Sequence, residues 1–227
     1  MLSTNDRRGG FYFVGDRPYV SVTQVLGVIS KPQLQYWFGN QIYWAMVANP
    51  SLDEKEAMAS PYQTSKQAMA RGTTVHTIVE AWRNIGDVKG LESSFAGYAK
   101  AFDKWRQDYN PKPLEHERTV VSSIYGYAGT LDLLAEINGI KCLIDVKTNK
   151  DANLYDEVQL QLSAYKQGLE EAGESVERMY ALALGENGDY NFKQFEPDLD
   201  TFLSAKRLWE WQNKAKCKKV NYKGGAF

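Results

Sequence analysis

The sequence predicts an α/β fold in which a mixed central β-sheet is flanked by helices. A β-hairpin is the clearest sign of the sheet, because the β-capable segments 131–137 and 140–148 enclose the strong two-residue turn Asn138-Gly139. A helix follows, with Val158, Leu162, Tyr165 and Leu169 as its apolar stripe. Two further strands are predicted over 176–184 and 190–194, so the helix is expected between strands of one sheet.

Other elements are predicted on both sides of this region. In chain order they are a hairpin over 11–20, a short helix over 21–29, a helix from Pro32 to about Asn49, a short helix from Ser51, a helix that begins between Gln63 and Arg71, a helix over 94–109, a strand over 117–123 that starts the sheet, and a closing helix from Asp198 to about Lys216. The stretch 151–156 is expected to be a polar connector.

The helix that begins at Pro32 carries aromatic residues on every side, including Tyr36, Trp37, Phe38 and Trp44. A helix that is apolar all round is usually buried between neighbours, and core packing is therefore the first interpretation. An exposed subset of these rings would instead suit stacking against unpaired bases.

The hairpin presents two charged side chains together. Alternation along a strand places Leu143, Asp145 and Lys147 on one face, and Cys142, Ile144 and Val146 on the other. Charges on an otherwise apolar strand need a partner such as a metal or a counter-ion.

Asp132 lies on the neighbouring strand of the hairpin. Two carboxylates can hold a divalent cation, and a lysine beside them can orient or activate a water for phosphodiester hydrolysis. Taken alone, Asp145 and Lys147 are more often an ordinary ion pair on a hairpin surface. Gln161 and Tyr165, four residues apart on the following helix, can reach the charged face and favour a functional site.

The ordered set His76, Gly129-x-x-Asp132, Asp145-x-Lys147 and Gln161-x-x-x-Tyr165 resembles the RecB-type branch of the PD-(D/E)XK nuclease superfamily. That branch includes nuclease domains of bacterial recombination helicases, the mitochondrial genome maintenance exonuclease and many phage exonucleases. The motifs span residues 71 to 169. The stretch 21–26, with Lys31-Pro32 and Trp37, is also similar to the stand-alone phage enzymes. Leu131 precedes Asp132 where the superfamily pattern has proline, which is usual in this branch.

The resemblance implies a restriction-endonuclease-like core with N-terminal helical additions. It also implies that His76, Asp132, Asp145 and the backbone carbonyl of Val146 bind Mg²⁺ or Mn²⁺. Asp132, Asp145 and Lys147 would then form the catalytic set. Gln161 and Tyr165 would hold the substrate strand or brace Lys147. Glu80, one helical turn after His76, would orient its imidazole or would simply be an exposed charge.

Composition sets further limits. The net charge of −1 gives the protein no overall positive charge with which to attract nucleic acid. A DNA groove must therefore come from local clusters such as Arg7-Arg8 or the lysines of 214–223. The alternative is that these residues are solvated terminal charges. Cys142 and Cys217, the only two cysteines, suit a reducing compartment and cannot build a four-cysteine iron–sulfur cluster.

No apolar run reaches the length of a membrane span and no signal-peptide pattern is present, so we expect a cytoplasmic protein, in a bacterial host cell if a phage encodes it. The sequence contains no phosphate-binding loop, which predicts that no nucleotide cofactor is used. Processive action would then need a recombination or single-strand-binding partner, or a homo-oligomer.

We expect one nuclease domain over 1–227, made of an N-terminal hairpin and helical region (1–70), a catalytic core (71–196) and a C-terminal helix with a basic tail (197–227). The predicted function is a metal-dependent DNA exonuclease in phage recombination, replication or repair, acting on single-stranded or duplex ends. A flap- or junction-cutting endonuclease is the alternative within nucleases. A non-catalytic nucleic-acid-binding protein and an adaptor are the alternatives outside them.

Overall fold

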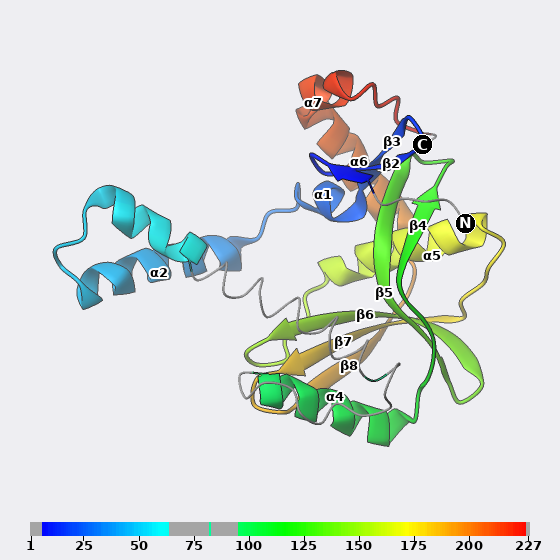
Figure 1. The fold of residues 1–227 in the computed structure, drawn as a ribbon, viewed down its shortest axis with the longest axis horizontal. Helices are drawn as coiled ribbons and strands as arrows, with labels where there is room; N and C mark the ends of the chain where they lie inside the picture. Colours follow the sequence, from blue (N-terminus) through cyan, green and yellow to red (C-terminus); the bar gives the residue numbers. More distant parts are fainter. Residues whose placement is uncertain (1–5, 64–81, 83–94, 226–227) are drawn as a thin grey trace.

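The computed structural model describes residues 6–63, 82 and 95–225, and its centre is one mixed eight-stranded sheet (Figure 1). The strand order is β1-β2-β3-β5-β6-β7-β8, and β4 pairs with β5 alongside this path. The β3–β5 and β6–β7 pairs are parallel and the others are antiparallel. Helices cover both faces, which confirms the predicted fold class.

The strands are β1 (Asp6–Arg8), β2 (Phe11–Val14), β3 (Arg17–Ser21), β4 (Lys112–Ser122), β5 (Tyr127–Ile137), β6 (Ile140–Asn149), β7 (Arg178–Gly185) and β8 (Tyr190–Phe195). The helices are α1 (Val22–Leu26), α2 (Pro32–Ala48), α4 (Ala96–Tyr109), α5 (Glu157–Glu171), α6 (Leu199–Gln212) and α7 (Lys214–Lys219), and residues 54–63 are also helical. Among the described helices, none has both the length and the apolar composition that a bilayer crossing requires.

The predicted central hairpin is confirmed as β5 and β6. Its two turn residues, Asn138 (φ 52°) and Gly139 (φ 78°), both adopt the left-handed conformation that a tight two-residue hairpin needs. The two faces of β6 separate as alternation predicts. Ile144 and Val146 join the core under α4, while Leu143 joins the core under α5.

Each face of the sheet has its own apolar core. Under α4, the fully buried rings of Phe102 and Trp105 pack with Trp82 and with β5, β6 and β7. The opposite core lies under α1, α5 and α6 and includes Leu162 and Phe202. The charged face of β6 belongs to this second side, so α5 decides what can reach it.

The N-terminal hairpin belongs to the same sheet, and the prediction that the strand near residue 117 starts the sheet was therefore wrong. β3 pairs in parallel with the first residues of β5, through Val20 with Tyr127 and Ser21 with Ala128. β3 can pair there because β6 pairs with β5 only from Leu133 onward. The first residues of β5 therefore have an edge that β6 does not occupy.

The prediction that α2 is a core helix was also wrong. Within the described part of the structure, no residue of α2 is buried, and Tyr36, Tyr43 and Trp44 are more than half exposed. The helix projects away from the sheet together with the helical residues 54–63 (Figure 1). The rings of Phe38 in α2 and Tyr62 in this second segment pack against each other. Aromatic residues on every side leave no single apolar stripe to dock on the sheet, so composition alone does not bury this helix.

An ion-pair cluster links β4 to β6 through Glu174, which lies in the chain that follows α5, and Glu115 adds a further ion pair to Arg118 at 3.1 Å. Glu174 lies 2.5 Å from the Arg118 guanidinium and 3.0 Å from the Lys141 ammonium. Hydrogen bonds from Arg118 and Lys141 lower the pKa of Glu174 to about 2. Since folding depresses this pKa, the cluster stabilises the fold above the unfolded value of about 4.3 and is lost as the pH falls toward 2.

Glu174→Gln is therefore expected to lower the free energy of unfolding by about 1 kcal/mol at neutral pH, and by steadily less below about pH 4. Chemical denaturation at pH 7 and pH 3.5 measures this difference. The exposed Glu54→Gln variant serves as the control and should match the native protein at both values. Equal destabilisation by Glu174→Gln at both pH values would show that the carboxylate charge is not involved.

Candidate active site

Asp132 lies where β5 and β6 separate. The last β5–β6 pair on this side is Leu133 with Ile144, and beyond it the Asp132 Oδ2 accepts a hydrogen bond from the Val146 backbone N–H at 2.7 Å. The side chain thus replaces a ladder hydrogen bond that the diverging strands cannot make. The Asp132 charge lies near Lys147 and Tyr165, since it helps to raise the pKa of both groups.

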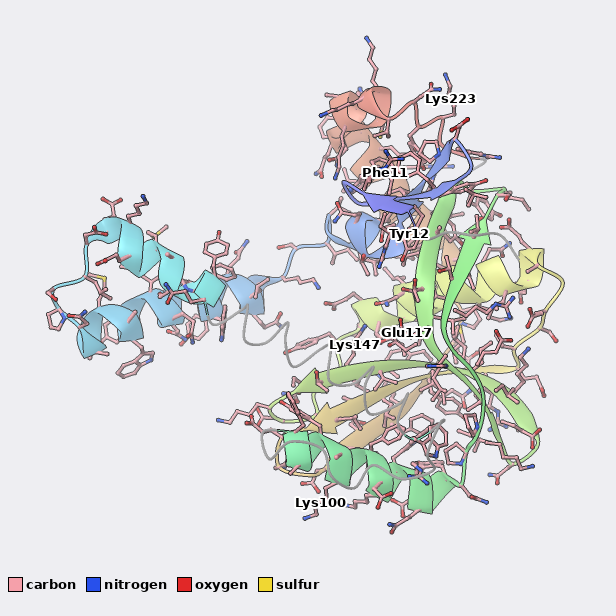
Figure 2. The ribbon with its side chains drawn as sticks, in the orientation of Figure 1. Phe11, Tyr12, Lys100, Glu117, Lys147 and Lys223 are labelled. Carbon is pink, nitrogen blue, oxygen red and sulfur yellow. The ribbon has the colours of Figure 1, made fainter. Side chains whose placement is uncertain are left out.

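Asp145 is a buried carboxylate, with 1% of the residue exposed. The Lys147 ammonium lies 2.8 Å from its Oδ2 and donates a hydrogen bond to its Oδ1 at 3.1 Å. Burial lowers the pKa of Lys147, but the charges of Asp145 and Asp132 outweigh burial and hold this pKa above its ordinary value. Lys147 is therefore a cation at neutral pH, held between the sheet and α5 (Figure 2).

Helix α5 supplies two polar groups that continue this chain of contacts. Lys147 donates a second hydrogen bond to Gln161 Oε1 at 3.2 Å, and Gln161 Nε2 donates to the Tyr165 hydroxyl at 3.0 Å. Both α5 residues are buried, at 8% and 3% exposure. Burial, with Asp145 and Asp132 nearby, raises the pKa of Tyr165 well above its ordinary value, so the phenol keeps its proton.

Gly129 makes the position of Tyr165 possible. A Cβ atom at Gly129 would lie 2.4 Å from Cε1 of the Tyr165 ring, well inside contact distance. The sequence singled out this glycine as part of a motif without giving it a structural role. The structure shows that its missing side chain makes room for the ring that fixes Gln161.

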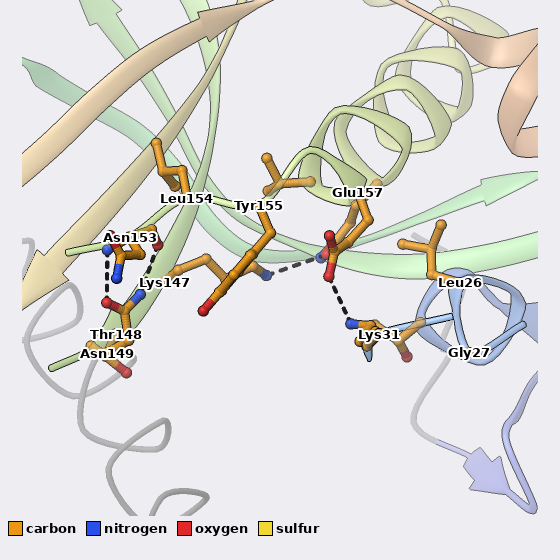
Figure 3. A pocket seen from close by; sticks show the side chains of 13 residues that line it. Leu26, Gly27, Lys31, Lys147, Thr148, Asn149, Asn153, Leu154, Tyr155 and Glu157 are labelled. Atoms are coloured by element: carbon orange, nitrogen blue, oxygen red, sulfur yellow. Dashed lines mark hydrogen bonds and ion pairs between the residues drawn. The ribbon is translucent and has the colours of Figure 1, made fainter. Parts of the chain in front are cut away.

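A pocket of about 330 Å³ opens beside this cluster (Figure 3). Lys147 and Gln161 line it together with Lys31, Tyr155 and Glu157. Lys31 and Glu157 form an ion pair of 2.8 Å, which joins the chain just before α2 to the first turn of α5. Burial would raise the pKa of Glu157, yet the hydrogen bond from Lys31 and the charge of Lys147 keep it below the ordinary value.

Tyr155 and Glu157 are not among the site residues that the sequence predicts. Tyr155 falls in the stretch interpreted as a polar connector, and Glu157 is an unremarkable first-turn residue of α5. An aromatic residue within a polar stretch directly before a site helix was the available signal. Only the fold shows that it lines the same pocket as Lys147.

Two predicted site residues, His76 and Glu80, lie outside the described residues. Within the described ranges, no group of three or more His, Cys, Asp or Glu side chains is arranged to hold a metal ion. The described part therefore contributes two carboxylates, Asp132 and Asp145. Both carboxylates lie near Lys147 and offer hard oxygen atoms, which is the donor chemistry that Mg²⁺ and Mn²⁺ accept.

The arrangement combines anionic and cationic groups at the mouth of a pocket. Two carboxylates can bind a cation or accept protons, and the Lys147 ammonium can donate to an anionic oxygen such as that of a phosphate. Gln161 and Tyr165 fix the ammonium in place. A group that is held rigidly by its neighbours loses little energy in reorienting when charge develops next to it.

The strands β2 and β3 and the helix α7, which come from the two ends of the chain, lie at the same end of the molecule (Figure 1). The Lys216 ammonium donates to Gln24 Oε1 at 3.1 Å and lies over the rings of Phe11 and Trp209. Arg7 lies over the Tyr12 ring of the same hairpin. Basic residues from both ends of the chain therefore pack on rings of β2.

Gly129→Ala is expected to destabilise the protein by on the order of 1–3 kcal/mol, because the new methyl group overlaps the buried Tyr165 ring and forces it to shift. Gly39→Ala is the matched control, since a Cβ there meets nothing within 4 Å and alanine favours a helix. Denaturant unfolding of both variants measures the difference. Equal stability of the two variants would contradict the packing of Tyr165 on Gly129.

Comparison with known proteins gave matches among solved structures only. No protein-family model matches the sequence, and no curated protein matches it. The protein SSO0001 is similar with a TM-score of 0.47 and 15% identity, covering 85% of this chain and 75% of that protein. An alkaline exonuclease from Laribacter hongkongensis is similar with a TM-score of 0.41 and 13% identity, covering 88% of this chain and 94% of that enzyme. A second structure of that enzyme, in complex with dAMP, gives a TM-score of 0.41 and 12% identity over the same shares.

Proposed function

We propose that this protein is a metal-dependent DNA nuclease that hydrolyses phosphodiester bonds at strand ends. The observation that carries the proposal is the contact chain from Asp145 through Lys147 and Gln161 to Tyr165, beside Asp132 and open to a pocket. An ordinary surface ion pair would need none of the buried groups that support Lys147. The sequence motifs on these same residues are the second support.

Mg²⁺ or Mn²⁺ would be held by Asp132, Asp145 and the backbone carbonyl of Val146, with His76 as a nitrogen ligand and Glu80 behind it. When bound, such a cation supplies charge neutralisation at the phosphate and a more acidic water. Two hard carboxylates near Lys147 suit this kind of ion. A histidine ligand would favour Mn²⁺ over Mg²⁺, because nitrogen suits transition metals better.

The chain's own groups supply the remaining chemistry. Lys147, as a cation, would donate a hydrogen bond to a non-bridging phosphate oxygen and stabilise the negative charge that grows there during attack by water. Gln161 would hold the ammonium in position through its amide oxygen. Tyr165, protonated and buried, would hold the Gln161 amide in the correct orientation through its hydroxyl.

The biological setting of the proposal is phage recombination, replication or repair in the cytoplasm of a bacterial host. The exonuclease assignment has a direct test. End-labelled single-stranded and duplex DNA is incubated with Mg²⁺, Mn²⁺ or EDTA, and the products are sized. Metal-dependent release of short products from the labelled end is expected. Internal cuts would support the flap or junction endonuclease instead, and binding without cleavage in either metal would leave only a nucleic-acid-binding function.

Asp132→Asn is expected to abolish cleavage while the fold is retained. The asparagine oxygen can still accept the Val146 N–H hydrogen bond, but the ligand charge is lost. Cleavage assays in Mg²⁺ and Mn²⁺, with a thermal unfolding curve for the same sample, separate the two effects. Near-native cleavage by Asp132→Asn would remove this residue from the metal site.

Lys147→Ala is expected to slow single-turnover cleavage by on the order of 10²–10³, since it removes a preorganised donor. Lys147→Arg keeps the charge in a larger, planar group and should not restore the rate. Lys150→Ala, which removes an exposed lysine directly after β6, is the control and should cleave normally. Calorimetry should show that Mn²⁺ still binds the Lys147→Ala variant, and normal cleavage by that variant would reduce Asp145 and Lys147 to a structural ion pair.

A further inference from the structure

A second pocket of about 540 Å³ adjoins the first, because both are lined by Lys31, Tyr155 and Glu157. The first pocket contains Lys147 and Gln161, whereas the second is lined by Leu34 and Trp37 of α2. The two adjoining pockets together form a surface groove that is lined by Lys147 in the first part, by Tyr155 in both parts and by Trp37 in the second. We call it the α2–α5 groove, and each part has a volume within the range of ligand sites, about 300–1,000 Å³.

The groove has aromatic walls and cationic groups along its length. Tyr155 is 51% exposed, and Trp37 is partly exposed on the side of α2 that faces the second pocket. Lys31 has 44% of its side chain exposed, and its ammonium has donors left beyond the contact with Glu157. Figure 3 shows Lys147, Tyr155, Glu157 and Lys31 around the first pocket.

We propose that the α2–α5 groove binds the unpaired nucleotides of a DNA strand, by stacking of bases on Tyr155 and Trp37, and so makes a single-stranded end the preferred substrate. This inference rests on the proposed nuclease function for the identity of the strand. A strand whose phosphate meets Lys147 must continue along an open path, and the groove is such a path. Aromatic faces bind bases only when the bases are not paired, since a duplex presents its edges and backbone.

The rest of the surface of α2 provides a matched comparison. Tyr36 (74% exposed) and Trp44 (62% exposed) are rings on the same helix, and neither lines the two pockets. A general attraction between aromatic surface and nucleic acid, or a protein partner on the helix, would depend on these residues. The groove would depend on Tyr155 and Trp37.

The test measures equilibrium binding of a fluorescent oligothymidine and of a blunt hairpin duplex to the full-length protein in EDTA, where no cleavage can interfere. Tighter binding of the oligothymidine than of the duplex is expected. Tyr155→Ala and Trp37→Ala should each weaken oligothymidine binding about 5- to 150-fold, the range typical of a lost base–aromatic stack. Tyr155→Phe and Trp37→Phe, which keep a ring, should bind within about twofold of the native protein.

Tyr36→Ala and Trp44→Ala are the controls and should bind oligothymidine normally. The proposal is overturned if the native protein binds the duplex as well as the oligothymidine, if the two groove variants bind normally, or if the two controls weaken binding as much. Unfolding curves for all variants show whether any loss of binding reflects loss of the fold.

The outcome is separable from that of the nuclease proposal. Loss of oligothymidine binding in the Tyr155→Ala and Trp37→Ala variants, combined with no cleavage in any metal, would support the groove and reject the nuclease. Metal-dependent cleavage, combined with normal oligothymidine binding by both variants, would support the nuclease and reject the groove.

Discussion

The buried charge of Asp145 is the constraint on which the rest of the site depends. A carboxylate that is 1% exposed is unfavourable unless a cation and hydrogen bonds compensate it. Lys147 provides the cation, Gln161 holds Lys147, and Tyr165 holds Gln161. Each group is fixed because the next one is fixed. The position of α5 relative to β6 is therefore as much a part of the site as the charged residues are.

The separation of β5 from β6 gives the second carboxylate its place. Once the strands diverge, the Val146 N–H has no backbone acceptor in β5 and bonds to Asp132 instead. The same divergence opens the first residues of β5 to β3, which brings the N-terminal hairpin into the sheet. One departure from regular pairing thus places a site residue and joins the N-terminal strands to the core.

The aromatic residues of helix α2 do not have the buried environment that their composition predicts. Its rings resemble those of a core helix in composition, yet in the described structure they remain at the surface, and one of them lines the groove that leads to Lys147. The only ion pair described at its start is that of Lys31 with Glu157 on α5. An attachment of this kind positions a helix beside a site without burying it, which suits a surface that receives a ligand.

The sequence by itself determined the central hairpin, the two faces of β6, the placement of Asp145 and Lys147 on one of them, and the spacing of Gln161 and Tyr165 on α5. These follow from local rules: the two-residue period of a strand, the helical repeat and the turn chemistry of Asn138-Gly139. Tertiary structure alone decided that the N-terminal hairpin joins the sheet, that α2 stays exposed, that Gly129 makes room for Tyr165 and that Tyr155 faces Lys147's pocket. Those outcomes depend on contacts between segments far apart in the chain, and periodicity within a single segment carries no information about which distant surface will cover it.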